Sequence, residues 1–275
     1  MKSEEIVQIT PLVKRITAGN SSVFTGPGTN TYIVGNREDL TVVDPGPALS
    51  EHIESIVSCS SNLSRIVVTH THPDHSPGVS LLQSKVDIPA YGLITESTKN
   101  QDTSFKPIKM LTHGEVVEAK DHNLEVIHTP GHASNHLCYL LKEEKLLFTG
   151  DHIMNGSTVV ISPPDGNMQD YLDSLNKLKE YDLENIAPGH GELLSNPHSV
   201  ADWIIDHRID RENKVIKAIK EAGSGNPDSL VEAVYDDVEE SLHFAARWSL
   251  EAHLIKLVNE GKAVKEGNKF LWLEN

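Results

Sequence analysis

The sequence predicts an α/β or α+β protein that ends in a small, mainly helical part. Short apolar runs rich in β-branched residues alternate with helical patterns from about residue 6 to residue 197. Most of these runs are apolar throughout, which is typical of strands that are covered on both faces. After Asn196 and Pro197 the pattern changes to charged helical segments. We therefore expect two domains, residues 1–197 and residues 198–275.

The first domain contains several clear strand candidates and one clear amphipathic helix. Apolar side chains at Tyr171, Leu172, Leu175 and Leu178 recur at the spacing of a helix. The strands are expected at residues 41–44, 65–69, 124–129, 136–141 and 145–149.

The C-terminal domain is expected to hold three helices and a pair of strands. Asp228 or Ser229 would cap the second helix, and Gly261 would end the third. Three helices followed by a hairpin are typical of a winged-helix-like domain, and a plain helical extension is the equal alternative. The helices are predicted at 198–222, from 226 onward and at 241–260, and the strands at 262–274 with a turn at 266–268.

Composition and charge limit the kind of protein. Of 275 residues, 38% are hydrophobic and 23% are charged, as in globular proteins. The longest apolar run, residues 137–141, is far shorter than the roughly 20 residues of a membrane span. The acidic first residues lack the apolar core of a secretory signal, and Cys59 and Cys138 are expected as reduced thiols. A cytoplasmic protein without a membrane partner is the resulting expectation.

The net charge disfavours polyanionic partners. The chain has 24 Lys and Arg residues against 40 Asp and Glu residues, a formal net charge of −16. Proteins that bind nucleic acids or anionic membranes normally present a basic surface. The total charge does not exclude such binding, because a local basic site or a bound metal ion would change the field around it.

The most specific feature is a cluster of potential metal ligands. His70, His72, Asp74 and His75 fall within six residues, directly after the 65–69 strand. Residues two apart on an extended backbone point the same way, so His70 and His72 can bind one ion. Pro73 turns the chain and lets Asp74 and His75 face a second point. Imidazole and carboxylate ligands suit Zn²⁺, and also iron or manganese.

Further ligand candidates lie at three other strand ends. His132 and His190 each follow a Pro-Gly pair after an apolar segment, and Asp151 follows Gly150. Pro-Gly ends a strand and turns the chain, which places each histidine at the edge of a sheet. Each residue alone is compatible with an ordinary turn, but their common placement predicts one site together with the 70–75 cluster.

Together, these motifs resemble the metallo-β-lactamase superfamily. The pattern H-x-H-x-D-H, followed by Gly-His, Gly-Asp and P-G-H-G, occurs here in the family's order, and residues 28–32 and 42–46 match its early strands. The resemblance covers nearly the whole chain and implies a four-layer αββα sandwich with a two-metal site at one edge. The most similar branch is the β-lactamase-like protein 2 type, which adds a winged-helix-like C-terminal part.

The resemblance also implies how the ligands divide between two ions. His70, His72 and His132 would bind the first ion, and Asp74, His75 and His190 the second. Asp151 would bridge both ions; class B1 lactamases have Cys at this position. The motif favours two Zn²⁺ ions per chain over the di-iron branch, with iron or manganese as alternatives.

The leading hypothesis is a dinuclear zinc-dependent hydrolase. A hydroxide that bridges the two ions would attack an ester, thioester or lactam-like carbonyl of a small-molecule substrate. Asp74 would orient this hydroxide and accept its proton. One alternative is a metal-dependent endoribonuclease that cleaves single-stranded RNA, because the similar branch includes RNA-cleaving members. An alternative of another class is a nucleic-acid-binding module in the C-terminal part.

The charge of the C-terminal part helps to rank these three hypotheses. Residues 201–275 contain 10 Lys and Arg against 15 Asp and Glu. A winged-helix domain that reads DNA needs Lys or Arg along its recognition helix, where this chain offers few. We therefore expect carbonyl hydrolysis in preference to RNA cleavage. The C-terminal part is expected to pack on the first domain or to form a homodimer contact.

The remaining notable residues carry weaker expectations. Asp44 either orients a ligand histidine or simply ends a strand. His136 and His152 are expected in solvent-exposed loops, with contact to the substrate as the alternative, because both neighbour candidate ligands. The three tryptophans are expected in the core: Trp203, Trp248 and Trp272.

Overall fold

The computed structural model describes residues 1–274 and divides the chain into two compact units. The second unit takes two segments from the range expected for the first domain, so the chain passes between the units more than once. The first unit consists of Met1–Thr129, Asn135–Ser157 and Tyr181–Pro197, and the second of Pro130–Ser134, Thr158–Glu180 and the chain from His198 onward.

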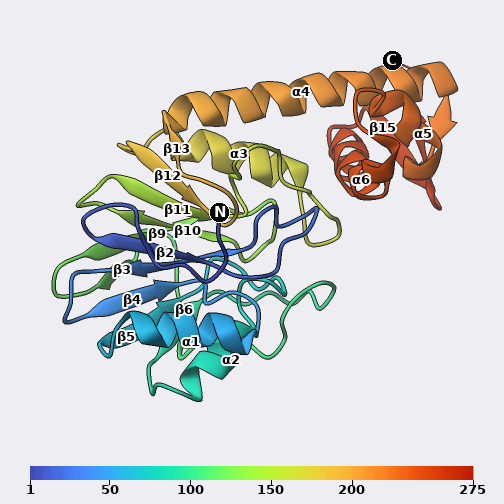
Figure 1. Cartoon of the computed structure of the whole chain (residues 1–275). Helices are drawn as coiled ribbons and strands as arrows, with labels where there is room; N and C mark the ends of the chain where they lie inside the picture. Colours follow the sequence, from blue (N-terminus) through green and yellow to red (C-terminus); the bar gives the residue numbers. More distant parts are fainter. Residues whose placement is uncertain (275) are drawn as a thin grey trace. The chain divides into compact units, whose positions relative to one another are not determined.

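Two mixed sheets form the first unit (Figure 1). All five predicted strands are present, within two residues of their expected bounds. The seven-stranded sheet contains, in spatial order, β1 (Val7–Gln8), β2 (Val13–Thr17), β3 (Asn30–Val34), β4 (Leu40–Val43), β5 (Leu63–Val67), β6 (Ala90–Gly92) and β7 (Lys109–Met110). The six-stranded sheet contains β13 (Leu194–Ser195), β12 (Asn185–Pro188), β11 (Leu146–Gly150), β10 (Leu137–Leu141), β9 (Asn123–His128) and β8 (Val116–Glu118).

The core of the first unit joins the two sheets. Val43 and Val67 of the seven-stranded sheet share one buried cluster with Leu137 and Phe148 of the six-stranded sheet. The rings of Tyr32 and Phe148 lie 5.1 Å apart in this core. Both sheets therefore bury one face against the other, which accounts for much of the apolar character of their strands.

Two helices cover the other face of the seven-stranded sheet. α1 (Ser50–Cys59) and α2 (Gly78–Gln83) share a second buried cluster with β3, β4 and β5 (Figure 1). Every residue of β3 and β4 is buried as a result. The expectation of a strand covered on both faces is thus confirmed for β4, the strand predicted at 41–44, whereas the edge strands β1 and β7 are exposed.

Parallel pairing brings the ends of four strands to the site. Val43 of β4 lies opposite Val67 of the parallel strand β5. Gly150 of β11 lies opposite Pro188 of the parallel strand β12. Because parallel strands end at the same edge of a sheet, the polar residues that follow each pair emerge side by side.

The second unit is mainly helical and holds the expected order of helices and hairpin. A buried cluster that includes Ile219, Val234, Leu254 and Phe270 joins its three C-terminal helices to its small sheet. The helices are α3 (Met168–Leu178), α4 (Pro197–Ala222), α5 (Pro227–Val234) and α6 (His243–Asn259), the last preceded by a 3₁₀ turn at Glu240–Leu242. The three-stranded sheet has the order β14 (Ser224–Gly225), β16 (Lys269–Trp272) and β15 (Ala263–Glu266).

Two expectations about the second unit were wrong. Asn226, and neither Asp228 nor Ser229, is the N-cap of α5. Its side chain accepts the amide of Ser229, the third residue of the helix, at 2.9 Å in a capping box. Trp203 and Trp248 are 56% and 38% exposed and are not core residues. These rings lie on helix surfaces, where Trp203 stacks on His207 at 5.6 Å.

None of the helices within residues 1–274 combines the length and apolar character needed to span a bilayer.

Candidate metal centre

The histidine cluster begins where β5 ends. Nε2 of His70 and Nδ1 of His72 lie 3.0 Å apart, so the two rings do point to the same place. Asp151, which follows β11, adds a carboxylate oxygen, and the ligand atoms of these three residues all lie within 4.8 Å of one another. The ends of strands from the two sheets thus bring together three candidate metal ligands.

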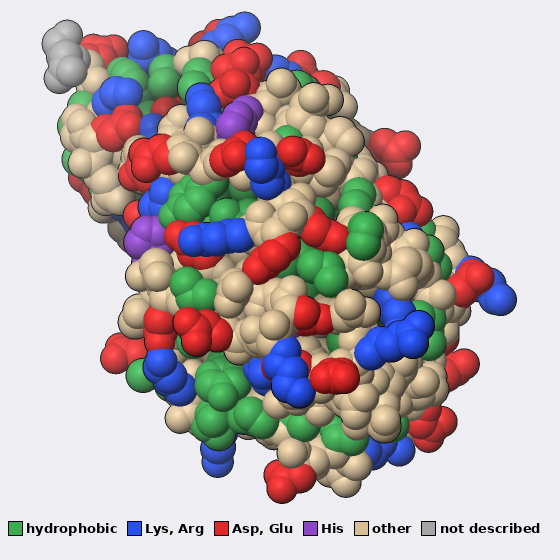
Figure 2. All heavy atoms as spheres, turned by 90° about the vertical axis from the view of Figure 1, so that its left-hand side faces the viewer, with side chains coloured by type: hydrophobic (Ala, Val, Ile, Leu, Met, Phe, Trp, Pro, Cys, Tyr) green, Lys and Arg blue, Asp and Glu red, His purple; other side chains and the backbone are tan. Residues whose placement is uncertain are grey.

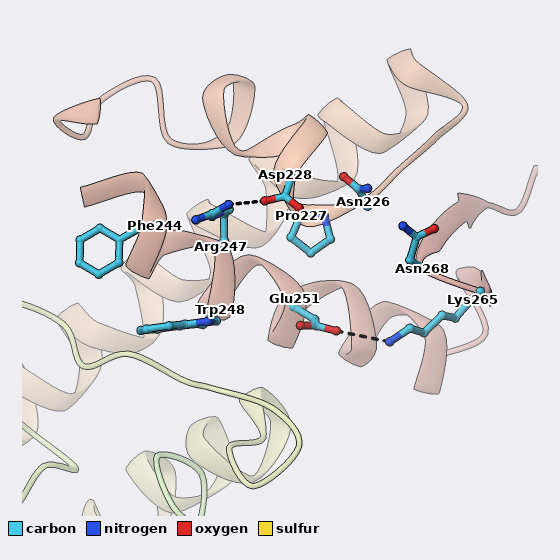
Figure 3. A pocket seen from close by; sticks show the side chains of 10 residues that line it. Asn226, Pro227, Asp228, Phe244, Arg247, Trp248, Glu251, Lys265 and Asn268 are labelled. Carbon is cyan, nitrogen blue, oxygen red and sulfur yellow. Dashed lines mark hydrogen bonds and ion pairs between the residues drawn. The ribbon is translucent and has the colours of Figure 1, made fainter. Parts of the chain in front are cut away.

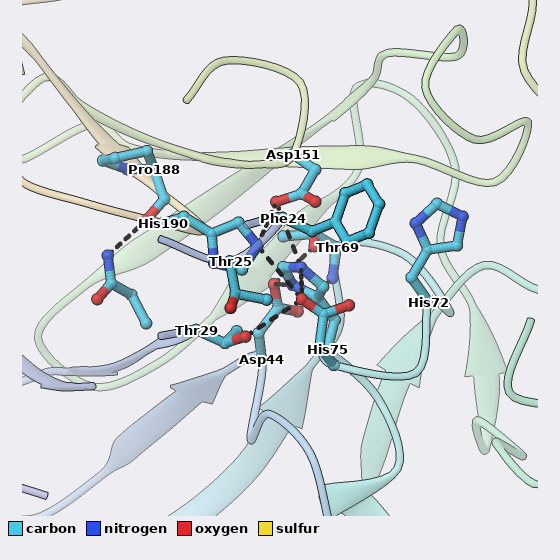
Figure 4. A network of polar contacts seen from close by, with 12 residues as sticks. Phe24, Thr25, Thr29, Asp44, Thr69, His72, His75, Asp151, Pro188 and His190 are labelled. Carbon is cyan, nitrogen blue, oxygen red and sulfur yellow. Dashed lines mark hydrogen bonds and ion pairs between the residues drawn. The ribbon is translucent and has the colours of Figure 1, made fainter. Parts of the chain in front are cut away.

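A second group of ligand atoms lies beside the first (Figure 4). Asp74, His75, Asp151 and His190 also place their ligand atoms within 4.8 Å of one another. Nε2 of His190 lies 3.2 Å from both Asp74 Oδ2 and Asp151 Oδ1, and Nε2 of His75 lies 3.4 Å and 3.3 Å from the same two atoms. Asp151 is shared by both groups.

His132 belongs to the second unit. Its Nδ1 donates a hydrogen bond to the carbonyl of Val160 at 2.7 Å, which leaves Nε2 as the ligand atom. His70 and His72 belong to the first unit, so a metal site that His132 shares with them stays a prediction.

Backbone and carboxylate acceptors orient the histidines of the second group. Asp44 accepts a hydrogen bond from Nδ1 of His75 at 2.9 Å, and the carbonyl of Gly28 accepts one from Nδ1 of His190 at 3.1 Å. Both imidazoles therefore turn Nε2 toward the carboxylates. Of the two expectations for Asp44, the structure shows that it orients a candidate ligand histidine.

Close backbone packing explains the glycine before His190. A Cβ atom on Gly189 would lie 2.7 Å from Oδ1 of Asp151 and 2.9 Å from Cε1 of His75. Only a residue without a side chain lets β12 end this close to the candidate ligands. The Pro-Gly-His motif is thus explained by the lack of space beside the site as well as by the turn.

In the second group, the carboxylates raise the pKa values of the histidines, and the histidines lower the pKa of Asp74. Burial raises the pKa of Asp74, but the charge of His75 and a hydrogen bond from His190 outweigh it and bring the pKa to about 2. Burial lowers the pKa of His190, but the carboxylates of Asp151 and Asp74 raise it to about 9. For His75 the same two carboxylates overcome burial and raise the pKa well above its usual value.

In the first group, the pKa of a histidine shifts in the opposite direction. Burial, together with the neighbouring His75 and His72, lowers the pKa of His70 well below its usual value. A neutral imidazole is the form that binds a metal ion. The converging imidazole nitrogens and the shared Asp151 carboxylate fit a pair of divalent ions, and this donor set suits zinc, iron or manganese.

Two histidines expected in exposed loops are fully buried instead. His136 and His152 are 0% exposed, and the ring of His136 lies 5.0 Å from that of His70. The buried hydroxyl of Thr129 lies 2.9 Å from Nδ1 of His136. The sequence around the two histidines does not indicate this burial, because residues distant along the chain, such as His70, lie against the ring of His136.

Thr29 is a further residue of the site that no motif in the sequence indicates. Its hydroxyl donates a hydrogen bond to Oδ2 of Asp74 at 3.2 Å (Figure 4). The motif at 28–32 was noted only for its similarity to family strands. A polar residue directly before a buried strand was the available signal.

A cavity of about 320 Å³ opens beside His190. Val23 and Phe24, which lie on the loop between β2 and β3, contribute apolar side chains to it. Glu192, its acidic lining residue, forms an ion pair with Arg15 at 2.6 Å. The other lining residues are Met1, Gly26, Pro27, Met154, Asn155, Ser157 and Gly191.

A second cavity, of about 490 Å³, lies in the C-terminal part between α5, α6 and the hairpin (Figure 3). Its two cations face carboxylates: Arg247 pairs with Asp228, and Lys265 lies 3.3 Å from Glu251. On the face drawn in Figure 2, the Lys and Arg side chains of the described residues alternate with Asp and Glu. Neither feature offers the unpaired basic surface that a phosphate backbone requires.

Comparison with known proteins identifies both parts of the chain. Residues 24–190 match the model of the metallo-beta-lactamase superfamily, and residues 227–272 match that of the beta-lactamase associated winged helix domain. The chain is 31% identical to a beta-lactamase-like protein 2 homolog of Caenorhabditis elegans, over 94% of this chain and 88% of that protein. It is 30% identical to an atrochrysone carboxyl ACP thioesterase of Aspergillus chevalieri, over 95% of this chain and 86% of that protein.

A solved structure shows the same fold. The crystal structure of a beta-lactamase domain protein from Burkholderia ambifaria superposes with a TM-score of 0.82 at 16% identity, covering 98% of this chain and 94% of the other. The expected sandwich and the winged-helix C-terminal part are confirmed by these comparisons.

Proposed function

Since the chain belongs to the metallo-beta-lactamase superfamily and is a hydrolase of that superfamily, we propose that it holds two zinc ions and hydrolyses an ester, thioester or lactam-like carbonyl. The observation that carries this proposal is the position of Asp151. Its carboxylate belongs to two groups of ligand atoms at once, which is the arrangement that a pair of neighbouring ions requires.

Under this proposal the seven candidate ligands keep the roles that the sequence implied. Asp151 would be the ligand shared by both ions. His70, His72 and His132 would hold the first ion, and Asp74, His75 and His190 would hold the second. Zinc bound here would supply a Lewis acid for the carbonyl oxygen and would lower the pKa of a water molecule from 15.7 to about 7.

The protein's own groups would do the rest of the chemistry. Asp74 stays ionised across the neutral range because its pKa is about 2, so its carboxylate can orient the attacking water by accepting a hydrogen bond. Thr29 fixes that carboxylate through its hydroxyl. In the same site, His75 is held by Asp44 and cannot rotate without breaking that bond.

The cavity beside His190 favours a small substrate with an apolar part. Val23 and Phe24 line it, and Lys and Arg are absent from its described lining residues. An RNA phosphate would meet Glu192 there, and Arg15, the cation beside it, is already paired with that carboxylate. The relative named as an atrochrysone carboxyl ACP thioesterase supports a thioester among the candidate substrates.

One experiment tests the proposal. The purified chain is analysed for metal content and screened at fixed salt against p-nitrophenyl acetate, an N-acetylcysteamine thioester, a chromogenic cephalosporin and a fluorogenic single-stranded RNA. We expect about two zinc ions per chain and turnover of a carbonyl substrate that a chelator abolishes. RNA cleavage without turnover of any carbonyl substrate would favour the endoribonuclease alternative, and full activity of the metal-free chain would end the proposal.

A further inference from the structure

The loop that carries His132 is held by the second unit. The amide of Asn167 donates to the carbonyl of Gly131 at 2.8 Å, and the hydroxyl of Ser174 donates to the carbonyl of Pro130 at 2.8 Å. Gly131 has a φ of 140°, and a Cβ atom there would lie 2.3 Å from Cα of Tyr171. The position of this loop therefore follows that of the segment before α3 and of α3 itself.

The imidazole of His132 is fixed by the same unit. Its Nδ1 donates to the carbonyl of Val160, which lies in the middle of residues 159–161, called here the 159–161 segment. Val159 and Ile161 on either side are 3% and 0% exposed. Any shift of the 159–161 segment would move the acceptor that orients the His132 ring.

Two helices of the C-terminal part hold the 159–161 segment in turn. Arg208 of α4 donates a hydrogen bond from Nη2 to the carbonyl of Val159. The hydroxyl of Ser249 on α6 accepts the amide of Ile161 at 3.1 Å. The two hydrogen bonds flank the carbonyl that accepts from His132, one residue away on each side.

The environment of Arg208 is unusual for a cation. Its side chain is buried, at 3% exposure, above the ring of Tyr171 at 5.4 Å, and its hydrogen bond goes to a neutral carbonyl. Three residues further along α4, Arg211 instead binds a carboxylate, that of Asp237, at 2.7 Å, which is the usual partner of a buried arginine. Burying a charge without a carboxylate is costly, so the position of Arg208 calls for a role other than ion-pair stability.

We propose that Arg208 and Ser249 are positioning residues for metal binding, which act through the 159–161 segment to hold His132 with its Nε2 ready for an ion. The C-terminal part then orients one candidate metal ligand, His132, which belongs to the same unit. This inference rests on the proposed metal-binding function of His132.

The test compares metal binding by variants of the full chain. Arg208→Met removes the hydrogen bond and the charge while it keeps the length of the side chain, and Ser249→Ala removes the smaller contact. Arg211→Met is the matched control, because it removes an equally buried arginine of the same helix that contacts Asp237 and the carbonyl of Val234. Zinc affinity and stoichiometry are measured by titration of the chelated protein, with circular dichroism to follow folding.

We expect Arg208→Met to weaken one of two zinc sites about 10- to 100-fold, as is typical when a group that orients a ligand histidine is lost. Ser249→Ala should weaken the same site less, Arg208→Lys should restore part of the affinity, and Arg211→Met should bind both ions like wild type even if its melting temperature falls. Cobalt substituted for zinc should show a changed absorption spectrum in Arg208→Met and an unchanged one in Arg211→Met.

The outcomes separate this inference from the proposed function. If wild type binds no zinc, the proposed function fails. If wild type binds two ions and both Arg208→Met and Ser249→Ala bind them with unchanged affinity, the metal proposal stands and the positioning role is wrong. If Arg208→Met does not fold, the zinc affinity of Ser249→Ala tests the positioning role: a weakened site supports it, and an unchanged affinity contradicts it.

Discussion

The carboxylate of Asp44 lies behind His75 and accepts a hydrogen bond from its Nδ1 at 2.9 Å. The same carboxylate accepts the amide of Thr69 at 2.7 Å and the hydroxyl of Thr69 at 2.6 Å. Asp44 therefore connects the end of β4 to the end of β5 and to a candidate ligand at once. Its φ of 48°, which few residue types adopt readily, turns the chain so that the side chain reaches both.

Replacing Asp44 by Asn should weaken zinc binding without unfolding the protein. Asn tolerates the left-handed backbone and can still accept the amide of Thr69, but its amide nitrogen cannot accept the hydrogen bond of His75. We expect zinc affinity to fall about 10- to 100-fold. Titration with a fluorescent zinc chelator measures it, and an affinity equal to that of wild type would show that His75 needs no such partner.

Asp74→Ala should abolish most hydrolysis while the fold survives. The substitution removes a candidate zinc ligand and the carboxylate that would orient the attacking water. Loss of such a group typically lowers kcat by about 10²- to 10⁴-fold. The measurement is kcat at saturating zinc with circular dichroism as the folding control. Near-wild-type turnover would mean that Asp74 was assigned the wrong role.

Gly189→Ala tests the close approach of β12 to the site. The added methyl group would meet Asp151 and His75 at less than contact distance, at 2.7 Å and 2.9 Å. Overpacking of this kind should lower the free energy of unfolding by about 1–3 kcal/mol and displace the ligands. Gly19→Ala is the matched control, because its nearest neighbour would lie at 3.8 Å. Equal zinc content in both variants would contradict the expectation.

The ion pair between Arg211 and Asp237 should make the second unit less stable in acid. The hydrogen bond from Arg211 lowers the pKa of Asp237 from 3.8 to about 2 in the folded protein. Because the folded pKa lies below the unfolded one, the pair contributes fully above pH 3.8 and loses its contribution as the pH falls through about 2. The carboxylate is half exposed, so the contribution is at most about 1 kcal/mol.

Thermal unfolding of Asp237→Asn at several pH values measures that contribution. The variant should melt below wild type at pH 6, and the difference should shrink between pH 4 and pH 2. Asp210→Asn removes a charge from the exposed surface of α4, the helix that carries Arg211, and serves as control. A difference for Asp237→Asn that stays constant down to pH 2 would show that the pair does not titrate as expected.

The sequence alone determined which residue types stand at the strand ends, and with them much of the site. The spacing of His70, His72, Asp74 and His75 is local, so an extended backbone followed by a turn already predicts where these side chains point. The strands were predictable for the same reason, since burial on both faces leaves a continuous apolar run.

The tertiary structure decided everything that depends on contacts between distant segments. Asp151 meets both ligand groups only because β11 ends beside β5. His136 and His152 are buried, and the residues next to them in the sequence do not indicate this burial. Trp203 and Trp248 are large and apolar, yet they lie on helix surfaces because the core beneath is filled by other side chains. Likewise, only the folded chain shows that Arg208 reaches the carbonyl of Val159, because a hydrogen bond between residues so far apart in the chain leaves no periodic trace in the sequence.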